Sequence, residues 1–156
     1  MSKRNFSLSE VEYIVIHCSA TRENRSYSVE DLLRDHVGRG FVGIGYHYYV
    51  TRDGHIHLTR PLDKMGAHVL GYNHCSIGIC YEGGLDEHGK PADTRTPEQR
   101  VSLLRLIRIV RQYCPLAIVL GHRDLTVDRN GDGRIRPDEW MKNCPCFDAR
   151  QAYSRI

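Results

Sequence analysis

The sequence predicts an α/β fold in which a single mixed β-sheet has helices packed on it. Short apolar runs rich in β-branched residues alternate along the chain with amphipathic segments that begin with helix-capping residues. The pair Asp53-Gly54 lies between two short strand-like runs and predicts a hairpin, so the sheet should contain antiparallel pairing as well. The 156 residues fit one domain without internal repeats. We therefore predict a single domain over residues 1–156, with its core at about 12–155.

The strands are predicted from short apolar runs that end in turn-forming residues. Residues 13–17 read Tyr-Ile-Val-Ile-His, which is typical of a buried strand with a histidine at its exit. The Asp53-Gly54 turn joins two of the other strands into the hairpin. The remaining expected strands are 45–51, 55–58, 76–81 and 116–120.

The helices are predicted from their capping residues and their period. Ser28 caps a short helix that ends at Gly38 and Gly40, and Thr96 with Gln99 forms a capping box for a longer one that reaches about Tyr113. A short terminal helix begins at about Asp148. The inward faces should carry Val29, Leu32, Leu33 and His36 in the first helix and Leu103, Leu104, Ile107 and Val110 in the second. Arg100, Arg105, Arg108 and Arg111 should lie largely outside.

Charge and hydropathy exclude several classes of partner. The net charge of +3 is mild and the basic residues are scattered, so we expect no nucleic-acid partner. No apolar run approaches the length of a membrane span, so membrane insertion is not expected. The first ten residues lack the apolar region of a secretory signal, which predicts synthesis in a cytoplasm without a signal peptide.

The chain has six cysteines, which is many for a protein without a secretory signal. In such a chain, metal binding or buried free thiols are expected rather than disulfides. Cys80 and Cys114 have apolar neighbours in the sequence and are predicted to be core thiols. Cys144 and Cys146 flank a proline near the end of the domain and need another explanation.

Two histidines stand where a buried strand meets its loop, because His17 follows Tyr-Ile-Val-Ile and His122 follows Ile-Val-Leu-Gly. Ligands bind at that edge of open α/β sheets, and imidazole is the commonest metal ligand near neutral pH. One such histidine is usually structural. Two of them with a late cysteine make three ligands for Zn²⁺, with a fourth position open for water or substrate. The pattern predicts a catalytic zinc site and leaves open which cysteine completes it.

Five parts of the chain resemble, in the same order, segments of a known family; they are residues 13–21, 45–54, 66–78, 121–124 and 142–148. The last reads Lys-Asn-Cys-Pro-Cys-Phe-Asp and is similar to the family's Lys-x-Cys-Pro-Gly-Phe-Asp. The chain thus resembles the N-acetylmuramoyl-L-alanine amidases of the phage T7 lysozyme type, which share a fold with the peptidoglycan recognition proteins. The resemblance runs from about Tyr13 to Phe147.

The resemblance implies a role for each matching residue. His17, His122 and Cys144 would be the zinc ligands, and Tyr46 with Lys142 would be the catalytic polar pair. His68 and Asn73 would line the substrate groove. The family's glycine after the Cys-Pro pair is Cys146 here, and the lysine-x-cysteine-proline spacing favours Cys144 over Cys146 as the ligand.

The resemblance also implies an activity, namely hydrolysis of the amide bond between the lactyl group of N-acetylmuramic acid and L-alanine in peptidoglycan. A phage or prophage lysin of this kind acts on the cell wall after release through a holin-type pore or another export route. The leading alternative is a non-catalytic peptidoglycan-binding module on the same fold, although such modules typically lack the cysteine ligand. A zinc hydrolase acting on another amide is a further alternative. Binding of an RNA polymerase follows from family analogy only.

Residues 128–139 fit the twelve-residue template of a calcium loop. Its ligands would be Asp128, Asn130, Asp132, the Arg134 carbonyl and Glu139, with Gly133 at the sixth position and Ile135 at the eighth. A bound Ca²⁺ would have a structural role, holding the loop between His122 and Cys144. The alternative is a glycine-rich turn stabilised by its own aspartates.

Overall fold

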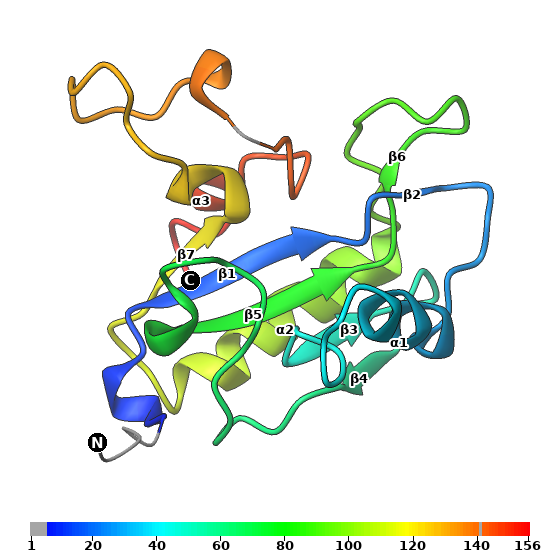
Figure 1. Cartoon of the computed structure of the whole chain (residues 1–156), viewed down its shortest axis with the longest axis horizontal. Helices are drawn as coiled ribbons and strands as arrows, with labels where there is room; N and C mark the ends of the chain where they lie inside the picture. The colour runs from blue at the N-terminus through cyan, green and yellow to red at the C-terminus, as the bar shows by residue number, and fades with distance from the viewer. Residues whose placement is uncertain (1–5, 141) are drawn as a thin grey trace.

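The computed structural model describes residues 6–140 and 142–156, which fold around a five-stranded sheet of order β4-β3-β5-β1-β7 (Figure 1). Its strands are β1 (Tyr13–Cys18), β3 (Tyr48–Val50), β4 (Ile56–Leu58), β5 (Ser76–Tyr81) and β7 (Ile118–Gly121). Strand β1 pairs in parallel with β5 and β7, β3 pairs in parallel with β5, and β4 pairs antiparallel with β3. The predicted single mixed sheet is confirmed. A short parallel pair, β2 (Thr21–Arg22) with β6 (Gly84–Leu85), was not predicted.

The helices are α1 (Val29–Gly38), α2 (Pro97–Arg111) and α3 (Ala149–Ala152), with short 3-10 turns η1 (Leu8–Glu10), η2 (Asn73–Cys75), η3 (His122–Leu125) and η4 (Pro137–Glu139). Figure 1 shows α1 and α2 on opposite faces of the sheet. Alternate residues of β1 point to opposite faces. Ile14 and Ile16 pack with the inner residues of α2, which places His17 on the face that α1 covers.

Helix α2 begins with the predicted capping box, in which Thr96 and Gln99 bond each other's backbone N–H groups. Its buried face was predicted with one error. Leu106 is buried and Leu104 is only half-buried. Together with Leu103, Ile107 and Val110, Leu106 completes the i, i+3, i+4, i+7 row that faces the sheet. Arg100, Arg105 and Arg108 are exposed as predicted, and Arg111 is half-buried.

Helix α1 also begins as predicted, with Ser28 accepting a hydrogen bond from the Asp31 N–H. Leu32 and His36 are buried, but Leu33 is 42% exposed and does not belong to the inner face. The His36 ring accepts a hydrogen bond from the Gly45 N–H at 3.0 Å, which ties the helix to the chain entering the hairpin.

Two strands are shorter or shifted relative to the prediction. In the hairpin, residues 45–47 and 51 of the predicted strand lie outside β3. Gly45 there passes so close to Ala67 that a Cβ at residue 45 would lie 2.1 Å from the Ala67 carbonyl oxygen. The predicted strand 116–120 is observed as β7 at 118–121. Leu116 is 91% exposed, and the Ala117 N–H donates to the Cys114 carbonyl, so these residues complete the turn after α2.

All six cysteines are free thiols, and Cys80 and Cys114 are buried in apolar clusters as predicted. No helix in the described part of the chain is long and apolar enough to span a membrane.

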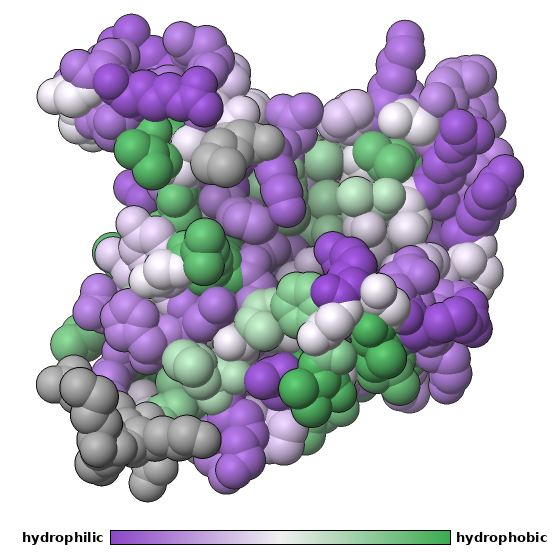
Figure 2. Space-filling model, in the orientation of Figure 1, coloured by the Kyte–Doolittle hydropathy of each residue, from purple (hydrophilic) through white to green (hydrophobic). Residues whose placement is uncertain are grey.

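The loop 126–139 forms a separate lobe between η3 and the C-terminal segment, residues 142–156, at the upper left of Figure 1. Figure 2 shows this lobe as a mainly hydrophilic projection at the upper left of the molecular surface. At its two ends the chain is held together, because the Arg123 guanidinium lies 4.0 Å from the centre of the Trp140 ring. The Arg123 N–H also donates to the Cys144 carbonyl at 2.9 Å. The lobe is therefore clamped at its base.

Gln99 joins α2 to the sheet and gives a test of this packing. Its fully buried amide donates to the Val50 and Glu82 carbonyls at 3.1 and 2.9 Å. Gln99→Leu leaves both carbonyls without this donor, and we expect unfolding to become easier by about 2–4 kcal/mol in urea denaturation. Arg105→Ala on the exposed face of α2 is the matched control, expected to change stability by less than about 0.5 kcal/mol. Equal stability of the two variants would contradict this role of Gln99.

Candidate metal centre

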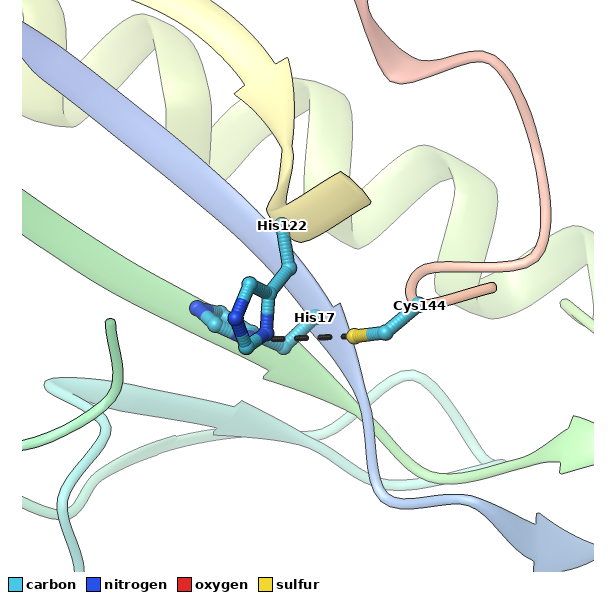
Figure 3. A group of neighbouring side chains, drawn as sticks. All are labelled: His17, His122 and Cys144. Atoms are coloured by element: carbon cyan, nitrogen blue, oxygen red, sulfur yellow. Dashed lines mark hydrogen bonds between the residues drawn. The ribbon is translucent and has the colours of Figure 1, made fainter. Parts of the chain in front are cut away.

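The sheet brings His17 and His122 to one edge. His17 lies near the end of β1, and His122 directly follows β7. These strands are parallel neighbours, with Ile16 opposite Gly121, so their carboxyl ends meet. Cys144 joins them from the C-terminal segment, where its Sγ accepts the Cys18 backbone N–H at 3.3 Å. The three predicted ligands therefore converge from three separate segments (Figure 3).

The geometry of this cluster fits zinc. One donor atom from each of His17, His122 and Cys144 lies within 4.8 Å of the others, and His17 Nδ1 is 3.7 Å from Cys144 Sγ. Around a tetrahedral zinc, nitrogen and sulfur ligands lie about 3.5 Å apart. Among the residues that the structure describes, no other group of three histidine, cysteine or acidic side chains meets the same distance limit. Two imidazoles and one thiol make a donor set that zinc accepts in catalytic sites.

Burial keeps both histidines in the form that binds metal. His17 is 1% exposed, and burial lowers its pKa well below the ordinary value. Burial also lowers the pKa of His122, to about 4. The positive charge of Lys142 acts in the same direction on both rings. Both imidazoles are therefore neutral at neutral pH and have a lone pair to offer a cation.

A chain of hydrogen bonds sets the tautomer of His17. The Ser76 hydroxyl donates to the Tyr72 carbonyl at 2.7 Å, so its oxygen is left to accept from His68 Nε2–H at 3.3 Å. His68 Nδ1 then carries a lone pair and accepts from His17 Nε2–H at 2.9 Å. His17 Nδ1 consequently bears no proton and points its lone pair toward Cys144. Ser76 and His68 thus leave His17 Nδ1 free to bind a metal ion.

The cluster opens into a groove of about 600 Å³ that includes Tyr46 and Lys142 among its lining residues. The Tyr46 ring lies 4.9 Å from the His17 ring, centre to centre. Burial raises the pKa of Tyr46, so the phenol keeps its proton at neutral pH. Lys142 is exposed at the rim. Helix α1 and the residues after it supply much of the remaining wall, including Arg34, His36, Arg39 and Phe41, to which the sequence patterns assigned no role in a site.

His68 and Asn73 lie near each other but differ in position. His68 lines the groove, whereas Asn73 is not among the lining residues. The Asn73 side-chain oxygen accepts the backbone N–H groups of His68 and Val69 at 2.8 and 2.9 Å. Asn73 therefore fixes the backbone that carries His68.

Ser76 is a contributor that the sequence patterns did not single out. It belongs to the segment 66–78 that the family resemblance covers, but a serine at the start of an apolar strand has no distinctive spacing. Strand alternation could have placed Ser76 on the site face of the sheet. Ser76, Gly78 and Cys80 share one face of β5, and Ile77 and Ile79 lie on the opposite face.

The predicted calcium-loop residues make hydrogen bonds within their own loop. Asp128 accepts from the N–H groups of Gly131 and Gly133, and Asn130 and Asp132 each accept from the residue two positions later. Glu139 accepts from the N–H groups of Arg129, Asn130 and Arg136. Asp132 also pairs with Arg136 at 2.8 Å. Arg134, the expected carbonyl ligand, lies on the exposed face of the lobe.

Comparison with known proteins agrees with this arrangement. The profile of the N-acetylmuramoyl-L-alanine amidase family matches residues 7–146, which include both histidines and Cys144. The chain belongs to the N-acetylmuramoyl-L-alanine amidase family. The family resemblance noted from the sequence motifs is thereby confirmed.

Members of this amidase family and their structural relatives resemble the whole chain. The endolysin of Enterobacteria phage K11 is 32% identical over 152 residues, which cover 97% of this chain and 91% of that protein. The structure of the endolysin N-acetylmuramoyl-L-alanine amidase LysCS from Clostridium intestinale has a TM-score of 0.66 at 26% identity, covering 93% of this chain and 84% of that one. Bumblebee PGRP-SA shares the fold, with a TM-score of 0.72 at 21% identity over 99% of this chain and 86% of its own.

The hydrogen-bonded chain behind His17 gives a test of the centre. Ser76→Ala removes the acceptor for His68 Nε2–H, so neither ring is held in the required tautomer. We expect zinc affinity, measured by competition with a fluorescent chelator, to fall by about 10- to 100-fold. Ser102→Ala is the control, because Ser102 donates to the Gly54 carbonyl at a distance from the groove. Wild-type zinc affinity in a folded Ser76→Ala protein would refute the role of this hydrogen-bonded chain.

Proposed function

We propose that this chain is a zinc-dependent N-acetylmuramoyl-L-alanine amidase, a hydrolase that cleaves the amide bond between the lactyl group of N-acetylmuramic acid and L-alanine in peptidoglycan. The observation that carries the proposal is the convergence of His17, His122 and Cys144 at the floor of a groove, within the segment that matches the family. These three residues would hold the metal. When bound there, zinc supplies a Lewis acid that polarises the amide carbonyl and brings the pKa of water toward neutrality.

Tyr46 and Lys142 would serve the reaction as hydrogen-bond donors. As the amide carbonyl is attacked, negative charge develops on its oxygen, and the Lys142 ammonium at the rim of the groove can stabilise that charge. The raised pKa of Tyr46 keeps its phenol protonated, so the phenol O–H can donate a hydrogen bond. Among the roles open to Tyr46, this favours a hydrogen bond to the developing oxyanion over removal of a proton from water.

The substrate would lie along the groove between α1 and the segment that carries His68. In this proposal His68 has two duties, contact with substrate and orientation of His17. Asn73 acts on substrate binding through the backbone of His68 rather than by direct contact.

The alternative of a non-catalytic peptidoglycan-binding module is disfavoured by the complete donor set. A binding module needs a groove but has no use for a thiol aimed at two neutral imidazoles. Here Cys144 Sγ lies within reach of His17 and His122, and the neighbouring Tyr46 and Lys142 line the same groove.

The proposal is tested by amide cleavage on purified peptidoglycan, with mass analysis of the released fragments. We expect the zinc-loaded protein to release intact stem peptides that begin with L-alanine. The metal-free protein and Cys144→Ser should release less than about one-hundredth as much, because the ligand set is incomplete. Cys75→Ser, which alters a buried thiol outside the groove, is the matched control and should stay active. A wild-type protein with full zinc occupancy that binds the wall and releases nothing would establish the binding module instead.

We also propose that the protein acts on the cell wall after synthesis in the cytoplasm and release through a holin-type pore or another export route. Its similarity to phage endolysins supports this location. Binding of an RNA polymerase stays a prediction from the family resemblance.

The carboxylates of Asp128, Asp132 and Glu139, all within the described part of the chain, do not converge on one point in this structure. We further propose that a structural Ca²⁺ would draw them together with Asn130 and the Arg134 carbonyl, as the loop template predicts. Binding to the folded state alone would raise the melting temperature when calcium is supplied. Thermal unfolding should therefore show an increase of about 2–8 °C in millimolar calcium relative to a calcium-free sample with zinc retained. Asp128→Asn should reduce that increase, and equal melting temperatures with and without calcium in wild type would refute the proposal.

A further inference from the structure

Two thiols beside the metal centre are not used by it. Cys18 is the last residue of β1, and Cys146 lies two residues after Cys144 in the C-terminal segment. Their Sγ atoms are 3.8 Å apart, although 128 positions separate the residues in the sequence. Cys18 is buried and Cys146 is half-buried, so a small reagent can reach the pair from the side of Cys146. The Cys18 thiol also has a side-chain hydrogen bond with Cys144, so three sulfurs lie close together here.

The surrounding backbone makes room for both sulfurs. Gly84 has a φ of +97°, and a Cβ at that position would lie 2.4 Å from Cys18 Sγ and 3.7 Å from Cys146 Sγ. Cys146 itself has a φ of +69°, a left-handed conformation that glycine adopts more easily than any residue with a side chain. The resembled family has a glycine there. This chain thus has a thiol at a position where the backbone conformation favours a residue without a side chain. That thiol lies directly against a second one.

We propose that Cys18 and Cys146 form a site of reversible oxidation, in which a disulfide links β1 to the C-terminal segment. The oxidant is a low-molecular-weight disulfide. One thiol attacks it and expels a first small thiol, and the second protein thiol attacks the mixed disulfide and expels the other. Two protein S–H bonds and one small-molecule S–S bond are replaced by one protein S–S bond and two small thiols. The protein sulfurs are oxidised and the reagent is reduced.

The disulfide would affect the metal centre by holding its segments in place, without binding the metal. Cys18 is next to His17, and Cys146 is two residues from Cys144, so the bond joins the segments that carry two of the three metal ligands. Cys144 also contacts the Cys18 thiol, and its Sγ accepts the Cys18 backbone N–H and faces His17 Nδ1, so zinc is supplied in the test to occupy Cys144 as a ligand. The oxidised protein should therefore keep its ligand set and hold it in a more rigid frame. In a reducing compartment the same protein carries two free thiols.

The test is a peptide map of the full chain, supplied with equimolar zinc and incubated overnight with either oxidised or reduced glutathione. Remaining thiols are then blocked by alkylation and the protein is digested. We expect a Cys18–Cys146 cross-linked peptide in the oxidised sample only. The oxidised protein should also melt about 5–10 °C higher, because the link closes a long loop in the unfolded chain.

Two variants make the result specific. Cys146→Gly removes the thiol and gives a residue that accepts the positive φ, so this variant should fold, lose the cross-link and lose the oxidation-dependent shift in melting temperature. Cys75→Ser should keep both. Separate alkylation of Cys18 and Cys146 after oxidation, a link that uses Cys144 instead, or an equal shift in Cys146→Gly would each overturn the proposal. The map needs no substrate, so its outcome is independent of the proposed amidase activity.

Discussion

The candidate metal centre depends on the parallel pairing of β1 with β7. Parallel strands end at the same edge of a sheet, so the residues that follow them are brought together even when they are far apart in the sequence. His17 and His122 meet for this reason alone. The third ligand is placed by contacts from the same two segments, since the Cys18 N–H bonds the Cys144 sulfur and the Arg123 N–H bonds the Cys144 carbonyl. Any change that shifts β7 along β1 would therefore move His122 relative to His17 and pull the two contacts of Cys144 apart.

Most elements of the fold could be predicted from local sequence patterns. The capping residues Ser28 and Thr96 mark the true starts of α1 and α2, and the β-branched run before His17 marks β1. The errors lie where tertiary contacts decide. Leu104 and Leu106 are both apolar, and the helical period allows either to lie on the buried face of α2. Only the position of the sheet decides that Leu106 is the buried one. Leu116 is apolar and belongs to a run that is typical of a strand, but it lies in the turn that follows α2.

The sequence predicted three candidate metal donors, which the structure brings together, but not the residues that surround them. His17, His122 and Cys144 could be selected because their residue types have few other uses at the ends of buried strands and through the resemblance of the surrounding motifs. The residues behind them are ordinary by type. Ser76 matters only because its hydroxyl already donates to Tyr72, and Cys146 matters only because Cys18 lies opposite. Such roles depend on which residues are neighbours in the folded protein, and the spacing of residues in the sequence does not show this.

The clamp at the base of the hydrophilic lobe has a consequence for how this chain can change over evolutionary time. Arg123 contacts both Trp140 and the backbone of Cys144, so the excursion between them starts and finishes at nearly the same place. Insertions, deletions or wholesale replacement of residues 126–139 can then accumulate without moving the donors on either side. The lobe is thus a place where a foreign peptide or a reporter could be grafted without moving the donors.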